Sequence, residues 1–246
     1  MNKPRFTFDK IKYATDTTTF DKAVALYEKG SVIDVKDNGF TYSAKVLGTQ
    51  PYDVVVSHKA YDNGDCTCYL GQNGVLCKHM VALALYIVKG GKTILTDEDK
   101  SITSEPGCSG ICAVLSKDDL SVIKQEITSA MKCIKAYDGP SRTWFANQNS
   151  VEEGCKRLSV IVSKLPVSKE TSDLLVTLLL RLERKIYSGG VDDSNGFVSG
   201  FMVDLVVVLQ EFVKLDEKCK KSFEKLKGLE TTFGWEEPLV ELIDNG

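Results

Sequence analysis

Histidine is nearly absent from this sequence, because only His58 and His79 occur among its 246 residues. A Ser-His-Asp triad would have to use one of these two side chains, and the His-Glu-x-x-His motif of zinc proteases does not occur. No glycine-rich phosphate-binding loop follows a predicted strand either. These absences leave little support for catalysis, and we expect a protein that is not an enzyme and has no small-molecule substrate.

Long apolar runs are missing as well. One of the longest, LLVTLLLRL from Leu174, contains Arg181 and is far shorter than the ~20 apolar residues that a membrane helix needs. Residues 1–13 lack the apolar segment of a signal peptide. We therefore expect no membrane span and a cytoplasmic, reducing location, where the eight cysteines are thiols or metal ligands rather than disulfides.

A strong excess of either charge is also lacking, since the net charge is −3 and the isoelectric point is about 5.6. Residues 1–92 carry 12 Lys or Arg against 9 Asp or Glu, whereas residues 93–246 carry 19 against 25. A dedicated nucleic-acid-binding domain is usually strongly basic. Any nucleic-acid contact is therefore expected in the first, mildly basic part, where phosphates would find more cations.

The first part of the chain mixes helical and strand patterns. Residues 31–58 alternate apolar and polar side chains in three runs, which are separated at residues 37–39 and 48–51. An Asn-Gly pair between alternating runs is a strong hairpin signal, so we predict an antiparallel meander of about three strands.

A predicted helix lies on each side of this meander. Residues 20–29 place apolar side chains at helical spacing before Gly30, a typical C-cap glycine. Residues 79–89 are apolar, rich in helix formers and followed by Gly90 and Gly91, which predicts a buried helix.

From about Ser116 onward the periodicity is almost wholly helical, with breaks at Pro166, Gly189 and Asp216. This pattern predicts a bundle of four to six helices. The expected fold class is thus α+β, with a small β-meander and a zinc-bound helix joined to an α-helical bundle. We expect an N-terminal domain at residues 1–92, a polar linker at 93–115 and an α-helical domain at 116–246.

Three cysteines and one histidine gather in the stretch CTCYLGQNGVLCKHM, which begins at Cys66. Cys66-x-Cys68 and Cys77-x-His79 supply three thiolates and one imidazole within fourteen residues, and zinc prefers these ligands in structural sites. Buried cysteines with a helix-capping His79 are the alternative reading. A catalytic zinc normally keeps one open position. Four ligands fill the shell, so we expect one structural zinc ion.

The Cys-x-Cys and Cys-x-His pairs, with a β-rich stretch before them and an apolar helix after them, resemble the SWIM zinc finger, and CKHMVALAL is similar to the second half of that family. The resemblance covers about residues 31–90. It implies that Cys66, Cys68, Cys77 and His79 are the zinc ligands. SWIM domains are associated with protein interaction and with DNA binding, so the resemblance narrows the function to these two classes.

Two functions follow as hypotheses. The first is an adaptor whose finger and helical domain mediate interaction with an unidentified protein partner. The second is a DNA-binding module that uses the finger and its β face. Its candidate phosphate-binding residues are Lys45, Lys59 and Lys78. Tyrosines between these lysines either stack on bases or occupy half-buried strand positions; they are Tyr42, Tyr52 and Tyr61.

The remaining cysteines and the tryptophans have ordinary alternatives. Cys108-x3-Cys112 is either a second metal pair or two free thiols, and we assign no role to either residue. Trp144 and Trp235, the only tryptophans, either anchor a partner or cover the ends of the bundle. The other cysteines without an assigned role are Cys133, Cys155 and Cys219.

One further segment, VDDSNGFV from Val191, is similar to a calcium-binding loop. Counting back from Gly196 places Val191 at the first ligand position and Met202 where a glutamate is needed, which argues against calcium. We expect Asp193 or Ser194 to cap the following helix instead. His58, at the end of a predicted strand, is interpreted as a surface histidine.

Overall fold

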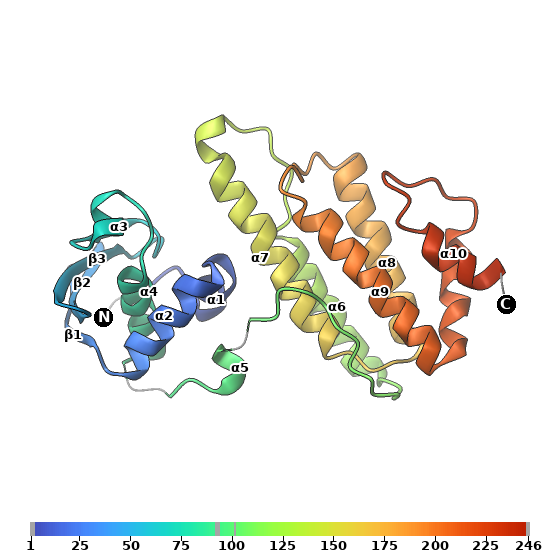
Figure 1. The fold of residues 1–246 in the computed structure, drawn as a ribbon, viewed down its shortest axis with the longest axis horizontal. Coiled ribbons are helices and arrows are strands. Elements are labelled where there is room, and N and C mark those ends of the chain that lie inside the picture. The colour runs from blue at the N-terminus through green and yellow to red at the C-terminus, as the bar shows by residue number, and fades with distance from the viewer. Residues whose placement is uncertain (1–2, 92–93, 101, 245–246) are drawn as a thin grey trace. The chain divides into compact units, whose positions relative to one another are not determined.

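The structure is a computed structural model that describes residues 3–91, 94–100 and 102–244. The chain divides into two compact units, Met1–Ile102 and Thr103–Gly246. We call them the finger unit and the helical unit. Each has its own buried hydrophobic core. The finger unit combines a sheet with helices, and the helical unit is a set of packed helices (Figure 1), which confirms the predicted α+β class.

The sheet of the finger unit is antiparallel, with the strand order β1-β2-β3-β4. The strands are β1 (Val32–Asp37), β2 (Thr41–Leu47), β3 (Pro51–Ser57) and β4 (Gly64–Cys66). The first three confirm the predicted meander. The fourth was not predicted, because three residues are too few to show alternation.

Strand β4 depends on a glycine. A Cβ atom at Gly64 would lie 2.0 Å from the carbonyl oxygen of Val55, so only glycine lets β4 approach β3 this closely. The resulting register pairs Cys66 with Val54 and thereby fixes Cys66 at the end of the sheet.

The opposite edge of the sheet is irregular. The register of β1 against β2 shifts between Ile33 and Lys36, which marks a β-bulge. Within it, Asp34 has a φ of 55°. Few residues other than glycine occupy this left-handed region, although Asp tolerates it better than most.

One face of the sheet packs against the helix that follows the cysteine cluster. This helix, α4 (Lys78–Lys89), buries every residue from His79 to Leu85. It lies between the sheet and α2 (Thr17–Glu28), as Figure 1 shows. The remaining helices of the finger unit are α1 (Phe8–Ala14), α3 (Tyr69–Gln72) and α5 (Asp97–Lys100). The predicted helices before Gly30 and Gly90 are thus confirmed as α2 and α4.

The helical unit contains the periodic segments that the sequence indicated. Its elements are α6 (Lys117–Met131), η1 (Ser141–Thr143), α7 (Trp144–Ser163), α8 (Lys169–Tyr187), α9 (Phe197–Leu215), η2 (Glu217–Leu226) and α10 (Glu237–Asp244). Residues 217–226, which lie in the region predicted to be helical, form the 3-10 helix η2. Its buried side chains recur every three or four residues, a spacing that both helix types produce. Among the described helices, none has the length and apolar character required to cross a bilayer.

We expected the segment 93–115 to be a polar linker. Its described residues up to Ile102 belong to the finger unit, and those from Thr103 belong to the helical unit. Leu95 lies in the core of the finger unit, and Asp99 forms an ion pair of 3.0 Å with Lys89. From Thr103 onward the chain runs along the C-terminal end of α7, where the backbone of Gly107 donates to Ser163 Oγ. Beyond Thr103 the segment is held by backbone and serine hydrogen bonds, and Cys108 and Leu115 pack against the core of the helical unit. These contacts are too scattered along the chain to give a periodic hydrophobic pattern in the sequence.

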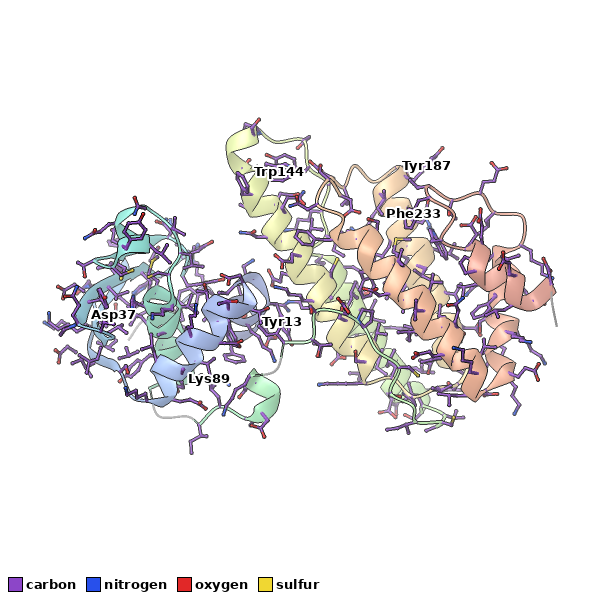
Figure 2. All side chains as sticks on the ribbon, viewed as in Figure 1. Tyr13, Asp37, Lys89, Trp144, Tyr187 and Phe233 are labelled. Atoms are coloured by element: carbon purple, nitrogen blue, oxygen red, sulfur yellow. The ribbon has the colours of Figure 1, made fainter. Side chains whose placement is uncertain are left out.

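The two tryptophans fold back on the helical unit. Trp235 is only 3% exposed and donates Nε1–H to Glu183 Oε2 at 2.8 Å, so it covers the bundle. Trp144, labelled at the start of α7 in Figure 2, is half-buried and donates to Asp192 Oδ2 at 2.8 Å. Asp193 accepts from the backbone N–H groups of Val198 and Ser199 at 2.8 and 2.9 Å, which confirms its capping role at α9.

These contacts predict that the helical unit needs its leading segment. A fragment of residues 103–246 should unfold at a higher temperature than a fragment of residues 116–246, because the shorter one loses several hydrogen bonds to the end of α7. Thermal melts followed by circular dichroism measure the difference. Equal midpoints would show that residues 103–115 contribute nothing to the fold.

Candidate metal centre

The predicted zinc ligands are brought together by three short elements. Cys66 is the last residue of β4, Cys68 is the N-cap of α3, and Cys77 is the N-cap of α4. His79 lies in the first turn of α4 and is buried, like the three cysteines. The pairs Cys66-x-Cys68 and Cys77-x-His79 thus each span the beginning of a helix.

The ligand atoms form a compact group. The three Sγ atoms and one imidazole nitrogen all lie within 4.8 Å of one another. His79 Nδ1 is 3.7 Å from Cys66 Sγ and 3.9 Å from Cys77 Sγ. A tetrahedral zinc with Zn–S of about 2.3 Å and Zn–N of about 2.0–2.1 Å places sulfur and nitrogen about 3.6 Å apart. The side chains therefore already stand close to the corners of a zinc tetrahedron.

Backbone donors make the pocket suitable for thiolates. The N–H of Cys68 points at Cys66 Sγ at 3.5 Å, and the N–H of Gly71 points at Cys68 Sγ at 3.4 Å. A hydrogen bond from the Cys66 thiol lowers the pKa of Cys77 to about 4, although burial opposes this shift. Donating that bond raises the pKa of Cys66, and burial raises it further. A bound cation would replace the shared proton and stabilise both sulfurs as thiolates.

The imidazole of His79 is oriented by stacking. Its ring lies against Tyr52 of β3, with centroids 4.4 Å apart and an angle of 27° between the planes. Because Nδ1 faces the three sulfurs, the proton of a metal-bound ring belongs on Nε2. Nε2 is buried and has no hydrogen-bond partner among the described residues. The pattern of single residues in the sequence did not reveal this role of Tyr52.

Gly71 is a second residue that the site requires. A Cβ atom at this position would lie 2.3 Å from the carbonyl oxygen of Cys66 and 2.5 Å from its Cβ. Glycine therefore lets α3 fold directly over the first ligand pair. The sequence offered a signal for it only in the turn-forming composition of GQNG.

The fold and the four buried ligands define a structural zinc finger, since the shell is filled by protein side chains. Residues 60–87 match the family model of the SWIM zinc finger, and this part of the chain is a SWIM finger with a Cys₃His set for one zinc ion. Neither the curated proteins nor the solved structures include a match to the chain. The matched residues lie within the finger unit.

The lysines expected on a nucleic-acid-binding face are placed apart. Lys45 is exposed on β2 and forms an ion pair of 2.8 Å with Asp53 on β3. Lys78 begins α4 next to the zinc ligands, whereas Lys59 follows the far end of β3. The seven residues of β3 span roughly 20 Å at about 3.3 Å per residue. The three ammonium groups therefore do not form one cluster.

The other candidates on the finger unit have structural roles. Tyr42 and Tyr61 are buried in the core, where they cannot stack on nucleobases, and Tyr52 holds His79. His58 stacks on Tyr42 with centroids 3.9 Å apart, and its Nε2 lies 3.0 Å from Asp37 Oδ1. His58 is thus half-buried, in contrast to the surface position that we expected.

The remaining cysteines do not extend the metal centre. Cys108 is half-buried and Cys112 is exposed, and within the described ranges only the SWIM ligands form a metal-ligating group. Cys155 and Cys219 are buried in the helical unit, and burial raises the pKa of Cys219 to about 11. These two side chains are therefore neutral thiols that pack as small apolar groups.

The site predicts one zinc ion per chain after purification under reducing conditions. The Cys77→Ala/His79→Ala double mutant should retain almost none, because two of four ligands are lost. Elemental analysis on protein of known concentration gives the ratio. The site would be disproved if the wild type held no zinc, or if the mutant held as much as the wild type.

The steric argument at Gly71 gives a second prediction. Gly71→Ala should weaken zinc binding at least tenfold, because the new methyl group collides with the backbone of Cys66. Competition with a chromogenic chelator measures the affinity. Gln72→Ala, next in the sequence and exposed, serves as the control and should change it little. Equal affinities for the two variants would contradict the close approach of α3 to the ligands.

Proposed function

We propose that this protein is a non-enzymatic adaptor whose SWIM finger binds another protein. One observation carries the proposal: the loop between the two ligand pairs turns apolar side chains toward solvent. Tyr69, Leu70 and Val75 are 81%, 44% and 49% exposed. Exposed aromatic and aliphatic side chains that gather on a surface are typical of protein-binding sites, and tyrosine is enriched among their energetic hot spots.

The loop that carries these side chains is held in place from several directions. Asp53 and Thr67 exchange two hydrogen bonds, of 3.0 and 3.1 Å, that tie the loop to β3. Val75 donates to the carbonyl of Leu70 at 3.0 Å, and the Asn73 side chain donates to Tyr69 at 2.7 Å. A bound zinc ion would also fix both ends of the loop, through Cys66 and Cys68 at one end and Cys77 and His79 at the other. A surface fixed in this way loses little conformational entropy on binding, which favours affinity.

The charge around the finger supports a protein partner over DNA. Asp53 on β3 and Asp65 on β4 are exposed. The strand register places both side chains on the face of the sheet that points away from α4. Lys45, on the same face, is paired with Asp53. A face of this mixed charge attracts phosphates weakly. The alternative function, DNA binding through the β face, therefore has less support than the adaptor.

The proposal gives zinc a structural role only. Four protein ligands leave no position for a water or a substrate, so the ion would stabilise the loop without taking part in a reaction. Its binding free energy, about 10–16 kcal/mol in comparable finger peptides near neutral pH, is large compared with the stability of a small domain.

Site-specific photo-crosslinking tests the adaptor. A photoreactive phenylalanine analogue at position 69 should form adducts with a partner protein in the native cells, and these adducts should persist after nuclease treatment. Tyr187 in the helical unit is the matched control, because it is 79% exposed and, like Tyr69, an aromatic side chain open to solvent (Figure 2). The analogue at position 187 should not capture the same protein.

A second measurement makes the result quantitative. Leu70→Ser/Val75→Ser should weaken affinity for the captured partner about tenfold or more, because apolar area is lost from the centre of the contact. Zinc content and circular dichroism must stay at wild-type values. Identical adducts from positions 69 and 187, or adducts abolished by nuclease, would refute the proposal.

A further inference from the structure

One part of the outward face of α6 in the helical unit groups polar side chains without an acidic residue among them. It lines a shallow hollow of about 390 Å³. The lining residues are Ser121, Lys124, Gln125, Thr128, Ser129 and Lys132. Every one of these side chains carries a hydrogen-bond donor, and two are cations.

An arginine from α8 completes a row of cations on this face. Thr128 lies four residues from both Lys124 and Lys132, so the three side chains are neighbours on one side of the helix. Arg181 Nη2 lies 3.5 Å from Thr128 Oγ1, which places the guanidinium beside the residue midway between the two lysines along α6. Eight residues separate Lys124 from Lys132, a distance of about 12 Å along the helix axis.

The three cations of this row have no acidic partner among the described residues. Lys124, Lys132 and Arg181 form no ion pair with an aspartate or glutamate there. Of the acidic side chains of α6, Asp119 and Glu126 lie on the side of the helix opposite Thr128, about 180° and 160° around it. Asp118, about 80° from Thr128, is in the first turn and does not line the hollow.

The same region contains a further sign of crowded positive charge. Lys185, one turn after Arg181 on α8, has its pKa lowered by burial and by the charge of Arg181. Some other lysines of the unit are paired, as Lys156 is with Glu152 at 2.9 Å and Lys169 with Asp173 at 2.6 Å. Cations that lie close together without an acidic partner create a positive potential that attracts anions.

We propose that this row, which we call the α6 cationic strip (Lys124, Arg181 and Lys132), binds the phosphate backbone of a nucleic acid. Protein–phosphate contacts use Arg and Lys together with Ser, Thr and Gln, the residue types of this face. A protein partner would need an apolar anchor, which the hollow lacks. Measured along the duplex axis, the strip's length of about 12 Å corresponds to three to four phosphates of one strand, which follow one another at about 3.4 Å of axial rise.

This inference goes beyond the adaptor and does not depend on it, since it concerns the other unit. With both in place, the protein would join a protein partner at the finger to nucleic acid at the helical unit. The contact is backbone-directed, so it should show little sequence preference and a strong dependence on salt.

Fluorescence anisotropy with a labelled DNA duplex of mixed sequence tests the strip on the full chain. We expect the triple variant Lys124→Gln/Arg181→Gln/Lys132→Gln to reduce the slope of log K against log salt by about 2.7, because each lost phosphate contact contributes about 0.9. The matched control is Lys214→Gln/Lys218→Gln/Lys221→Gln, which removes the same charge from exposed lysines on α9 and η2. The control should keep the wild-type slope.

Three outcomes would overturn the proposal: no measurable binding to duplex DNA or to single-stranded RNA at low salt, equal losses in the strip and control variants, or binding to anionic vesicles alone. If the triple variant fails to fold, the exposed single changes Lys124→Gln and Lys132→Gln each serve, with an expected loss of about 0.9 in slope. Crosslinking from position 69 should be unaffected by all these variants, so failure of the strip and failure of the adaptor are distinguishable.

Discussion

Coordination of one zinc ion by Cys66, Cys68, Cys77 and His79 is the constraint on which the finger unit depends. The two ligand pairs come from β4 and from the start of α4, so the ion joins the edge of the sheet to the helix that fills its core. Without it, three buried thiols and an imidazole share one pocket with few hydrogen bonds among them. The thiolate form of such a group is costly to bury unless a cation neutralises it. Packing around α4 and metal binding therefore stabilise each other.

The ligands themselves were predictable because the zinc-binding residue types, cysteine and histidine, recur at short, regular spacing in the sequence. The meander was predictable because alternation over six or seven residues is a strong pattern, and so were α2 and α4. What the sequence did not reveal are features that depend on contacts between distant segments. Strand β4 is too short to have a pattern, and the support of His79 by Tyr52 joins residues that lie in different elements.

The positions of the lysines in the fold were also not predictable from the sequence. Lys45, Lys59 and Lys78 were grouped because they lie in one mildly basic part of the sequence, but the fold separates them and pairs Lys45 with Asp53. Conversely, Lys124 and Lys132 lie in the acidic part of the chain, where the sequence gives no sign of a basic surface. They become a single row only when α8 brings Arg181 to Thr128. Net charge of a segment is therefore a poor guide to local potential when ion pairs and helix faces redistribute it.

The irregular edge of the sheet limits the ways in which the finger can recognise a partner. An exposed edge strand normally offers a ladder of backbone groups to which another strand can add. In β1 the bulge at Asp34 interrupts that ladder, and at the other edge β4 has only three residues. Neither edge presents a long regular template, so the sheet is protected against unwanted extension into aggregates. Recognition by the finger must then use side chains, and its selectivity can change by substitution of a few exposed residues while the backbone stays constant.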